Sequence, residues 1–362
     1  DRDATRRGRA DGDGSGAGGH ASRAGALMIT EATSRPRVSF VIPVKNDAGR
    51  LRRCLESIAA NSYRHDAVEI IVADNGSVDG SPDVATACGA TVLRLPGYRV
   101  SDVRNRAAAA ASGAIFAFVD ADHEISPLWI EAAADALTDE GAGAVGALCR
   151  PPSNGTWVQQ MYGVLRGSTV GRRDVEWLGA GNMAVRREAF QAVGGFDLTL
   201  ESCEDVDLCQ RLRQAGWRIV GDERLDNVHL GDPATLGQLF RAERWRGRNN
   251  LRVTFQPAWT WRSIVSGVIP IVQMISIALF VALAAASVWW NRLPWVGFAL
   301  LAAAAVAPSL ARTLRMTTSA RLSSAGRIAQ ALCVALTFDM ARAVALVGAS
   351  QHHRQPVRED ST

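Results

Sequence analysis

The sequence predicts an α/β domain with a mostly parallel sheet, followed by C-terminal transmembrane helices. From Arg37 onward, short apolar runs rich in β-branched residues alternate with segments of helical spacing. Strands that alternate with helices are typical of a parallel sheet covered on both faces. Beyond residue 263 the composition changes to long uncharged stretches, which are typical of membrane spans.

Each predicted element follows from a change of period along the chain. Strands are expected at 38–44, 68–74, 90–95, 114–120 and 142–149. Helices are expected at 49–60, 84–89, 101–113 and 127–137. In the third of these helices, Ser101 is the expected N-cap and Gly113 the expected C-terminal stop.

The two ends of the chain differ from the segments between them. Residues 1–34 carry Gly, Arg and Asp without an apolar period, and this composition predicts a disordered N-terminal extension. Met28 is the first methionine, so residues 1–27 need not belong to the natural protein. We expect the α/β domain at 35–262, a membrane region at 263–349 and a polar tail at 350–362.

Two uncharged runs, Ile264 to Trp290 and Leu293 to Ala311, are long enough to cross a bilayer core of about 30 Å. A third apolar segment, Ile328 to Val347, contains Asp339 and Arg342. It either spans the membrane with these two residues paired at i,i+3, or lies in the interface as an amphipathic helix.

The distribution of charge indicates a location and excludes a class of partner. Arginines precede the first apolar run and follow the second, whereas Arg292 stands alone between them. By the positive-inside tendency, the α/β domain faces the cytoplasm from the cytoplasmic membrane. The net charge is only +4, so no nucleic-acid partner is expected. The 6 cysteines form no CxxC pair, which favours a reduced compartment.

Acidic side chains follow three of the predicted strands, in "PVKND", "ADNGS" and "DADHE". Each stretch taken singly is typical of a turn, but the carboxyl ends of parallel strands share one sheet edge, where ligands bind. Two carboxylates at i and i+2 suit Mg²⁺ or Mn²⁺ that also contacts a diphosphate. Farther along, Glu204 and Asp205 begin a helix, where acids are also favoured by the helix dipole alone.

Six segments together resemble the inverting family 2 glycosyltransferases, which have a GT-A fold. They read "VSFVIPVKN", "EIIVADNGSVDGS", "VRNRAAAAASGAIFAFVDAD", "GAGNMAVRREAFQAVGGFD", "CEDVDLCQRLRQAGWRI" and "VHLG". They occur in the order found in the family and run from about residue 37 to 231. The resemblance thus covers the whole of the predicted α/β domain.

The resemblance implies a site for a nucleotide-sugar donor linked to UDP or GDP. Asp74 would contact the base, and Pro43 and Asn46 would shape the same pocket. Arg104 matches a position that usually faces the diphosphate, and Asp120 would contact the ribose.

The resemblance also implies a catalytic role for the second set of acids. Asp122 would bind Mg²⁺ or Mn²⁺, with His229 as a further metal contact. Asp205, in the pair with Glu204, matches the catalytic base. A single carboxylate base with direct attack implies inversion at the anomeric carbon.

The segment before the first apolar run bears on the acceptor. Processive synthases of the family carry Q-x-x-R-W here, whereas this chain reads "RAERW", with Arg241 in place of the Gln. This difference and the few membrane helices predict a single addition. Arg244, Trp245 and Arg248 are expected to bind a lipid-linked or membrane-proximal acceptor. Alternatively, the arginines only contact anionic membrane lipid, at ~1 kcal/mol each.

Two other function classes remain open from the sequence. A sugar nucleotidyltransferase also uses an α/β sheet with acidic metal ligands, although "VIPVKND" lacks the Gly-rich phosphate loop of that class. A non-catalytic membrane scaffold would keep the fold without needing Asp74, Asp120, Asp122 and Asp205 together.

Overall fold

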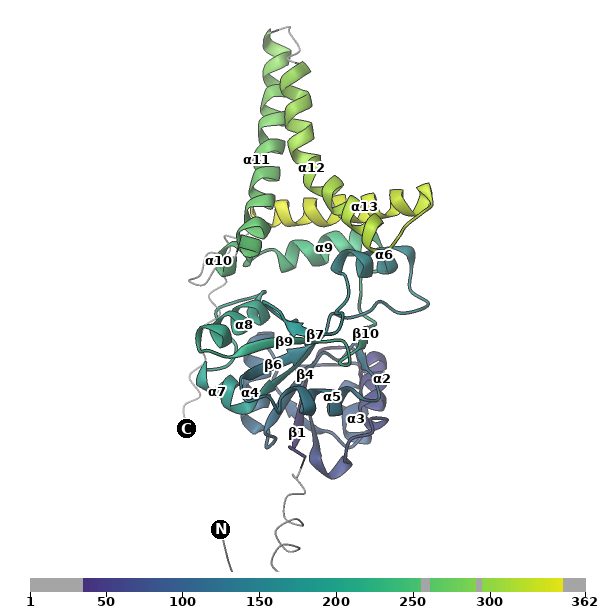
Figure 1. The fold of residues 1–362 in the computed structure, drawn as a ribbon, viewed down its shortest axis with the longest axis vertical. Helices are drawn as coiled ribbons and strands as arrows, with labels where there is room; N and C mark the ends of the chain where they lie inside the picture. The colour runs from purple at the N-terminus through teal and green to yellow at the C-terminus, as the bar shows by residue number, and fades with distance from the viewer. Residues whose placement is uncertain (1–34, 255–260, 291–294, 348–362) are drawn as a thin grey trace, which may run out of the picture. The chain divides into compact units, whose positions relative to one another are not determined.

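A computed structural model describes residues 35–254, 261–290 and 295–347 of the 362-residue chain. The predicted N-terminal extension at 1–34, the segment 291–294 with Arg292 and the predicted tail at 350–362 lie outside the described residues. The description below therefore concerns the α/β domain and the helices that follow it (Figure 1).

The central sheet has eight strands in the order β3-β2-β1-β4-β8-β6-β9-β7. Their bounds are β1 Val38–Val44, β2 Val68–Asp74, β3 Thr91–Arg94, β4 Ile115–Val119, β6 Ala142–Gly146, β7 Arg172–Asp174, β8 Asn182–Arg186 and β9 Arg218–Asp222. Strands β3, β2, β1 and β4 run parallel to one another, and β6 runs parallel to β9. A second, two-stranded sheet pairs β5 His123–Ile125 with β10 Asn227–His229.

The five strands expected from the sequence are confirmed, and the sheet is larger than they predict. Strand β8 lies antiparallel between β4 and β6, so a reversed strand interrupts the parallel sheet. Only the half formed by β3, β2, β1 and β4 is a continuous parallel sheet. The three acidic strand ends all belong to this half.

Helices cover both faces of the sheet, as expected. They are α2 Ala48–Ala59, α3 Ser81–Ala87, α4 Val100–Ala110, α5 Trp129–Ala136, α6 Trp157–Arg166, α7 Arg187–Ala192, α8 Glu204–Gln214, α9 Leu236–Arg246 and α10 Asn250–Thr254. Side chains alternate along each strand, so Phe40 and Ile42 pack with Leu51 of α2 and Trp129 of α5 in one buried cluster. Phe118 belongs to a second cluster, with residues of α4, α7 and α8.

Two predicted features of α4 are wrong. The helix starts one residue before Ser101, whose buried hydroxyl donates to the Leu200 carbonyl at 3.4 Å rather than capping the helix. The helix ends at Ala110, and Gly113 has no positive φ. Gly113 is required for close approach instead, because a Cβ there would lie 2.7 Å from the Ser39 nitrogen on β1.

Among the described residues, three helices after the α/β domain are long and apolar enough to cross a membrane, with candidate spans at Gly267–Ser287, Trp295–Ser319 and Ala325–Ala345. The helices themselves are α11 Trp261–Trp290, α12 Trp295–Ser319 and α13 Ala325–Ala345. Helices α11 and α12 lie side by side, whereas α13 runs across their base beside α9 (Figure 1). A small buried cluster joins α6, α9, α12 and α13.

The predicted i,i+3 pair of α13 does not form. Asp339 instead accepts from Arg312 of α12 at 2.8 Å, and Arg342 pairs with Glu243 of α9 at 2.8 Å. Glu243 is fully buried and also accepts from Arg246 at 2.7 Å. Asp339 and Arg342 therefore bind neighbouring helices, whereas Arg327 near the start of α13 is exposed. Met340 and Val344 on α13, and Val347 just after it, are exposed apolar side chains.

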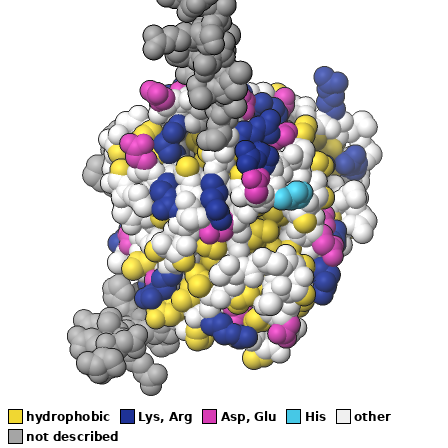
Figure 2. All heavy atoms as spheres, turned by 90° about the horizontal axis from the view of Figure 1, so that it is seen from below, with side chains coloured by type: hydrophobic (Ala, Val, Ile, Leu, Met, Phe, Trp, Pro, Cys, Tyr) yellow, Lys and Arg dark blue, Asp and Glu magenta, His cyan; other side chains and the backbone are white. Residues whose placement is uncertain are grey.

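The face of the α/β domain seen in Figure 2 carries charges of both signs. Arginine and acidic side chains are interspersed there, with apolar side chains between them. The described part of the domain also carries exposed ion pairs, such as Arg64 with Asp66 and Arg218 with Asp174. Such pairs contribute little to stability.

Candidate active site

The site is built where β4 ends and the chain turns into β5. Asp120 and Asp122 follow β4, and β5 pairs antiparallel with β10 so that His123 lies opposite His229. This register brings Asp122 beside His229, with 3.2 Å between Asp122 Oδ2 and His229 Nε2. Two residues that are far apart in the sequence thus meet through one short ladder.

The charges around His229 hold Asp122 ionised. Burial lowers the pKa of His229, but its bonds to Asp122 and Asp232 outweigh burial and raise the pKa to about 9. Burial raises the pKa of Asp122, but the hydrogen bond and charge of His229 outweigh it and hold that pKa well below its usual range. A Cβ on Gly231 would lie 1.8 Å from Asp122 Oδ2, so only glycine allows this close packing.

Three side chains at this point suit a divalent cation. Asp122, His123 and His229 offer ligand atoms that all lie within 4.8 Å of one another. Within the described part of the chain, these three residues form a group that could hold a metal ion. Burial and the charge of His229 lower the pKa of His123 to about 4, so its ring is neutral near pH 7. A carboxylate oxygen with imidazole nitrogens suits Mn²⁺ better than Mg²⁺, which favours oxygen ligands.

A buried arginine connects Asp120, the candidate for ribose binding, with Glu204, the neighbour of the candidate catalytic base. Arg104 of α4 donates through Nη1 to Glu204 Oε1 and through Nη2 to Asp120 Oδ1, both at 2.7 Å. Its side chain is only 5% exposed, so in this structure it binds two carboxylates rather than facing open solvent. The guanidinium neutralises Glu204 and fixes Asp120 at the exit of β4.

Asp205 is the acid of the pair that forms no ion pair with an arginine in the part of the chain that the structure describes. It follows Glu204 in the first turn of α8, after Cys203, which has a left-handed φ of 62°. The Val206 nitrogen donates to Asp205 Oδ1 at 2.8 Å, and a Cβ on Gly179 would lie 3.8 Å from Oδ2. Burial and then the charge of Glu204 raise the pKa of Asp205 to about 6. The carboxylate is therefore ionised near pH 7 and retains enough basicity to accept a proton.

The residues expected at the nucleotide base lie together at the ends of β1 and β2. Val44 of β1 pairs with Asp74 of β2, and Pro43 directly precedes Val44. Asn46 Oδ1 accepts from the Val78 nitrogen at 2.8 Å, while Asp74 accepts from the Ser77 nitrogen at 3.1 Å. Asp74 is fully buried, so its carboxylate also fixes the loop that follows β2.

The three acceptor candidates lie on α9 and just after it. Arg244 is exposed, and Trp245 is 43% exposed. Arg248 Nη1 lies 3.3 Å from Glu201 Oε2. Asn249 accepts from the backbone nitrogens of Glu201 and Ser202, both at 3.2 Å. The segment before the first membrane helix is thereby attached to the loop that leads to Asp205.

Several residues of the site were not predicted from the sequence. The sequence pattern assigns no role to His123, Asp232, Arg166 or Arg50. Arg50 Nη1 lies 3.7 Å from Asp122 Oδ2. For His123 the signal was its place directly after "DAD". The other three have no local signal, because their contacts depend on pairing between distant segments.

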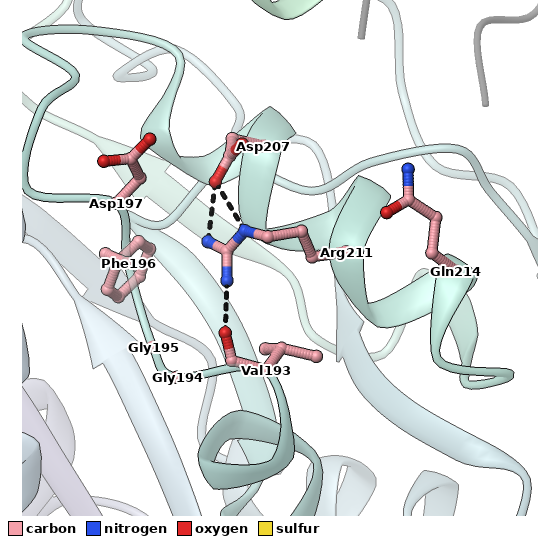
Figure 3. Close-up of a pocket in the computed structure, with 8 residues that line it drawn as sticks. All are labelled: Val193, Gly194, Gly195, Phe196, Asp197, Asp207, Arg211 and Gln214. Carbon is pink, nitrogen blue, oxygen red and sulfur yellow. Dashed lines mark hydrogen bonds and ion pairs between the residues drawn. The ribbon is translucent and has the colours of Figure 1, made fainter. Parts of the chain in front are cut away.

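A separate hollow of about 460 Å³ lies beside the opposite face of α8, near Asp207, Arg211 and Gln214 (Figure 3). Arg211 donates to Asp207 Oδ2 at 2.6 Å and 2.8 Å and to the Val193 carbonyl at 2.7 Å. Helical periodicity directs this face away from Asp205. The hollow therefore does not belong to the acidic site.

Comparison with known proteins agrees with this geometry. Residues 39–194 match the model of glycosyl transferase family 2. The chain is 27% identical over 230 residues to the glycosyltransferase AglE of Haloferax volcanii, covering 60% of this chain and 74% of that protein. It is 33% identical over 210 residues to the N-acetylglucosaminyl-diphospho-decaprenol L-rhamnosyltransferase of Mycobacterium tuberculosis, covering 46% of this chain and 67% of that protein.

A solved structure shares the fold across nearly the whole chain. It is the mannosyltransferase PcManGT from Pyrobaculum calidifontis in complex with GDP-Man and Mn²⁺, with a TM-score of 0.57 and 18% identity. The match covers 88% of each chain. The central sheet, the acidic strand ends and the family match together lead to one conclusion: the chain belongs to glycosyltransferase family 2 and has a GT-A fold.

Proposed function

We propose that the protein is a membrane-bound, metal-dependent glycosyltransferase that moves one sugar from a UDP- or GDP-linked donor to a lipid-linked acceptor, with inversion. The observation that carries this proposal is that the acids of the site have different partners and different pKa shifts. Asp122 is paired with His229, Glu204 with Arg104, and Asp205 keeps a raised pKa. The family assignment supplies the reaction class.

The donor would lie along the carboxyl ends of β2, β1 and β4. Asp74, with Pro43 and Asn46 beside it, would bind the base, and Asp120 would bind the ribose. Arg104 would hold Asp120 in place. Asp122 and His229 would hold Mn²⁺ or Mg²⁺, which as a Lewis acid stabilises charge on a departing nucleoside diphosphate.

Asp205 would act as the general base. Its carboxylate would accept the proton of the acceptor hydroxyl, or orient a lipid-phosphate oxygen, as that atom attacks the anomeric carbon. Glu204 is less suited to this role because Arg104 holds it at 2.7 Å. With one base and direct attack, the anomeric configuration of the product is inverted.

The acceptor is proposed to reach Asp205 from the membrane side. Arg244, Trp245 and Arg248 would contact its phosphate and lipid, and this is supported by the Arg248–Glu201 ion pair near the base. The Mycobacterium relative is named for a decaprenol-linked substrate, which favours the same class of acceptor. The arginines around α9 also favour a cytoplasmic catalytic domain. The presence of Arg241 where processive synthases have Gln favours a single addition.

Metal-dependent donor binding tests the proposal directly. Calorimetric titration of the purified protein with UDP- and GDP-sugars should show binding that is strengthened at least tenfold by Mn²⁺ for one of the two nucleotides. A non-catalytic scaffold should show no metal-dependent binding. A sugar nucleotidyltransferase should instead consume nucleoside triphosphate, and either result would contradict the proposal.

The pKa of Asp205 predicts the acid limb of the pH profile. Because its pKa is raised to about 6, the carboxylate is protonated below that pH and cannot accept a proton. The value of kcat/KM should therefore fall about tenfold per pH unit below about pH 6 and level off above it. Rates measured with saturating Mn²⁺ from about pH 5 to 8 check this. A flat profile through pH 6 would contradict the assignment.

A further inference from the structure

We infer that Asp232 is a positioning residue for His229, fixing the ring orientation and the tautomer with which Nε2 faces Asp122 and a divalent cation. The inference rests on the proposed function, in which His229 and Asp122 hold the metal. It assigns Asp232 a role through His229, without contact to the metal or the substrate.

The imidazole of His229 lies between two carboxylates. Its Nδ1 is 2.7 Å from Asp232 Oδ1, and its Nε2 is 3.2 Å from Asp122 Oδ2. The Asp232 carboxylate at Nδ1 holds a proton on that nitrogen. A cation bound beside Asp122 would displace the other ring proton, from Nε2, and would then face the Nε2 lone pair. Metal-bound histidines commonly have such a carboxylate partner on the second ring nitrogen.

Asp232 is itself held on both oxygens. Arg166, at the end of α6, donates through Nη1 to Oδ1 at 2.6 Å and through Nη2 to Oδ2. The side chain of Gln159, also on α6, donates to the Asp232 carbonyl at 2.8 Å. The Asp232 side chain is completely buried. Its oxygens are thus occupied, and this favours positioning over direct metal ligation.

The test is the affinity for Mn²⁺ of the full-length Asp232→Asn protein, purified in detergent. The Asn side chain has the same size as that of Asp. Arg166 should keep its hydrogen bond to the amide oxygen, which turns the amide NH₂ group toward His229 Nδ1. That hydrogen bond selects the tautomer with the proton on Nε2, which cannot bind a cation. The Kd for Mn²⁺, measured by electron paramagnetic resonance, should rise about 10- to 100-fold.

A double-mutant cycle separates positioning from other effects. If Asp232 acts through His229, then Asp232→Asn should change the Mn²⁺ affinity little in a His229→Ala background. Asp226→Asn is the matched control, because Asp226 also lies next to β10 but its side chain pairs with that of Arg150 rather than with the His229 ring. It should leave the Mn²⁺ affinity unchanged.

Asp232→Asn leaves the charge of Arg166 without its carboxylate partner, so the fold must be verified by circular dichroism. If the single variant does not fold, the charge-balanced pair Arg166→Gln with Asp232→Asn is measured instead. Unchanged Mn²⁺ affinity, or an equal loss in the His229→Ala background, would overturn the inference while leaving the proposed function intact. Absence of Mn²⁺ binding by the unaltered protein would overturn both.

Discussion

Replacing Asp205 with Asn should lower the rate of sugar transfer by roughly 10²- to 10⁴-fold, the usual contribution of a general base. Asn keeps the shape of the side chain but cannot accept the acceptor's proton. Donor affinity should be unchanged, because Asp205 is proposed to act on the acceptor alone. Steady-state rates together with donor titration by calorimetry measure both quantities.

The fold should tolerate this substitution. The pKa of Asp205 is raised in the folded protein to about 6, so its stabilising effect is present at low pH and is lost as pH rises through about 6. At neutral pH, removing the charge should leave the melting temperature equal or higher. A loss of activity that accompanies unfolding would not match this expectation.

Glu204→Gln is the informative comparison for Asp205→Asn. It removes the neighbouring charge but leaves Asp205 ionisable, and it frees one side of Arg104. We expect a smaller loss of rate than with Asp205→Asn and a lower pKa on the acid limb. An active Asp205→Asn protein with an inactive Glu204→Gln protein would identify Glu204 as the base instead.

Replacing Asp122 with Asn should lower transfer by about three orders of magnitude. A metal at a departing diphosphate contributes several kcal/mol, and each 1.36 kcal/mol changes the rate about tenfold. Asn removes the anionic ligand that faces His229 at 3.2 Å. The variant should also lose the Mn²⁺-dependent part of nucleotide binding, which calorimetry resolves without any turnover.

Glu124→Gln provides the control from β5, the strand that directly follows Asp122. Glu124 continues the spacing of Asp120 and Asp122, but it forms an ion pair with Arg53 at 2.5 Å and stands outside the metal group. Its loss should change rate and Mn²⁺ affinity less than twofold. Equal effects of Asp122→Asn and Glu124→Gln would show that general negative charge, rather than a ligand position, matters.

The parts of the fold set by local periodicity were predictable. Strands β1 and β2 were predicted to the residue, and Glu204 and Asp205 were expected at the start of the helix that they begin. Strand β8 was missed because its insertion between β4 and β6 depends on which distant strand completes the sheet. Gly113 was misinterpreted because a glycine after a helix resembles a stop, whereas here it allows contact with β1.

The site was only partly predictable for the same reason. Asp122 and His229 were proposed together from the family resemblance, but their distance depends on the pairing of β5 with β10. The Asp232–Arg166 pair depends in addition on α6, and no sequence period indicates it. An Asp339–Arg342 pair at i,i+3 was one of two alternatives for its segment, and both residues bind other helices instead.

The measurement that tests the central claim most directly is transfer by membranes that contain the protein, supplied with UDP- and GDP-sugars. Products are analysed by mass and anomeric configuration, with Mn²⁺ or with chelator. We predict one sugar added to a lipid-extractable acceptor, with inverted configuration and only in the presence of the metal. Transfer that persists with chelator, retains the donor's configuration, or proceeds equally well to soluble acceptors without lipid would contradict this account.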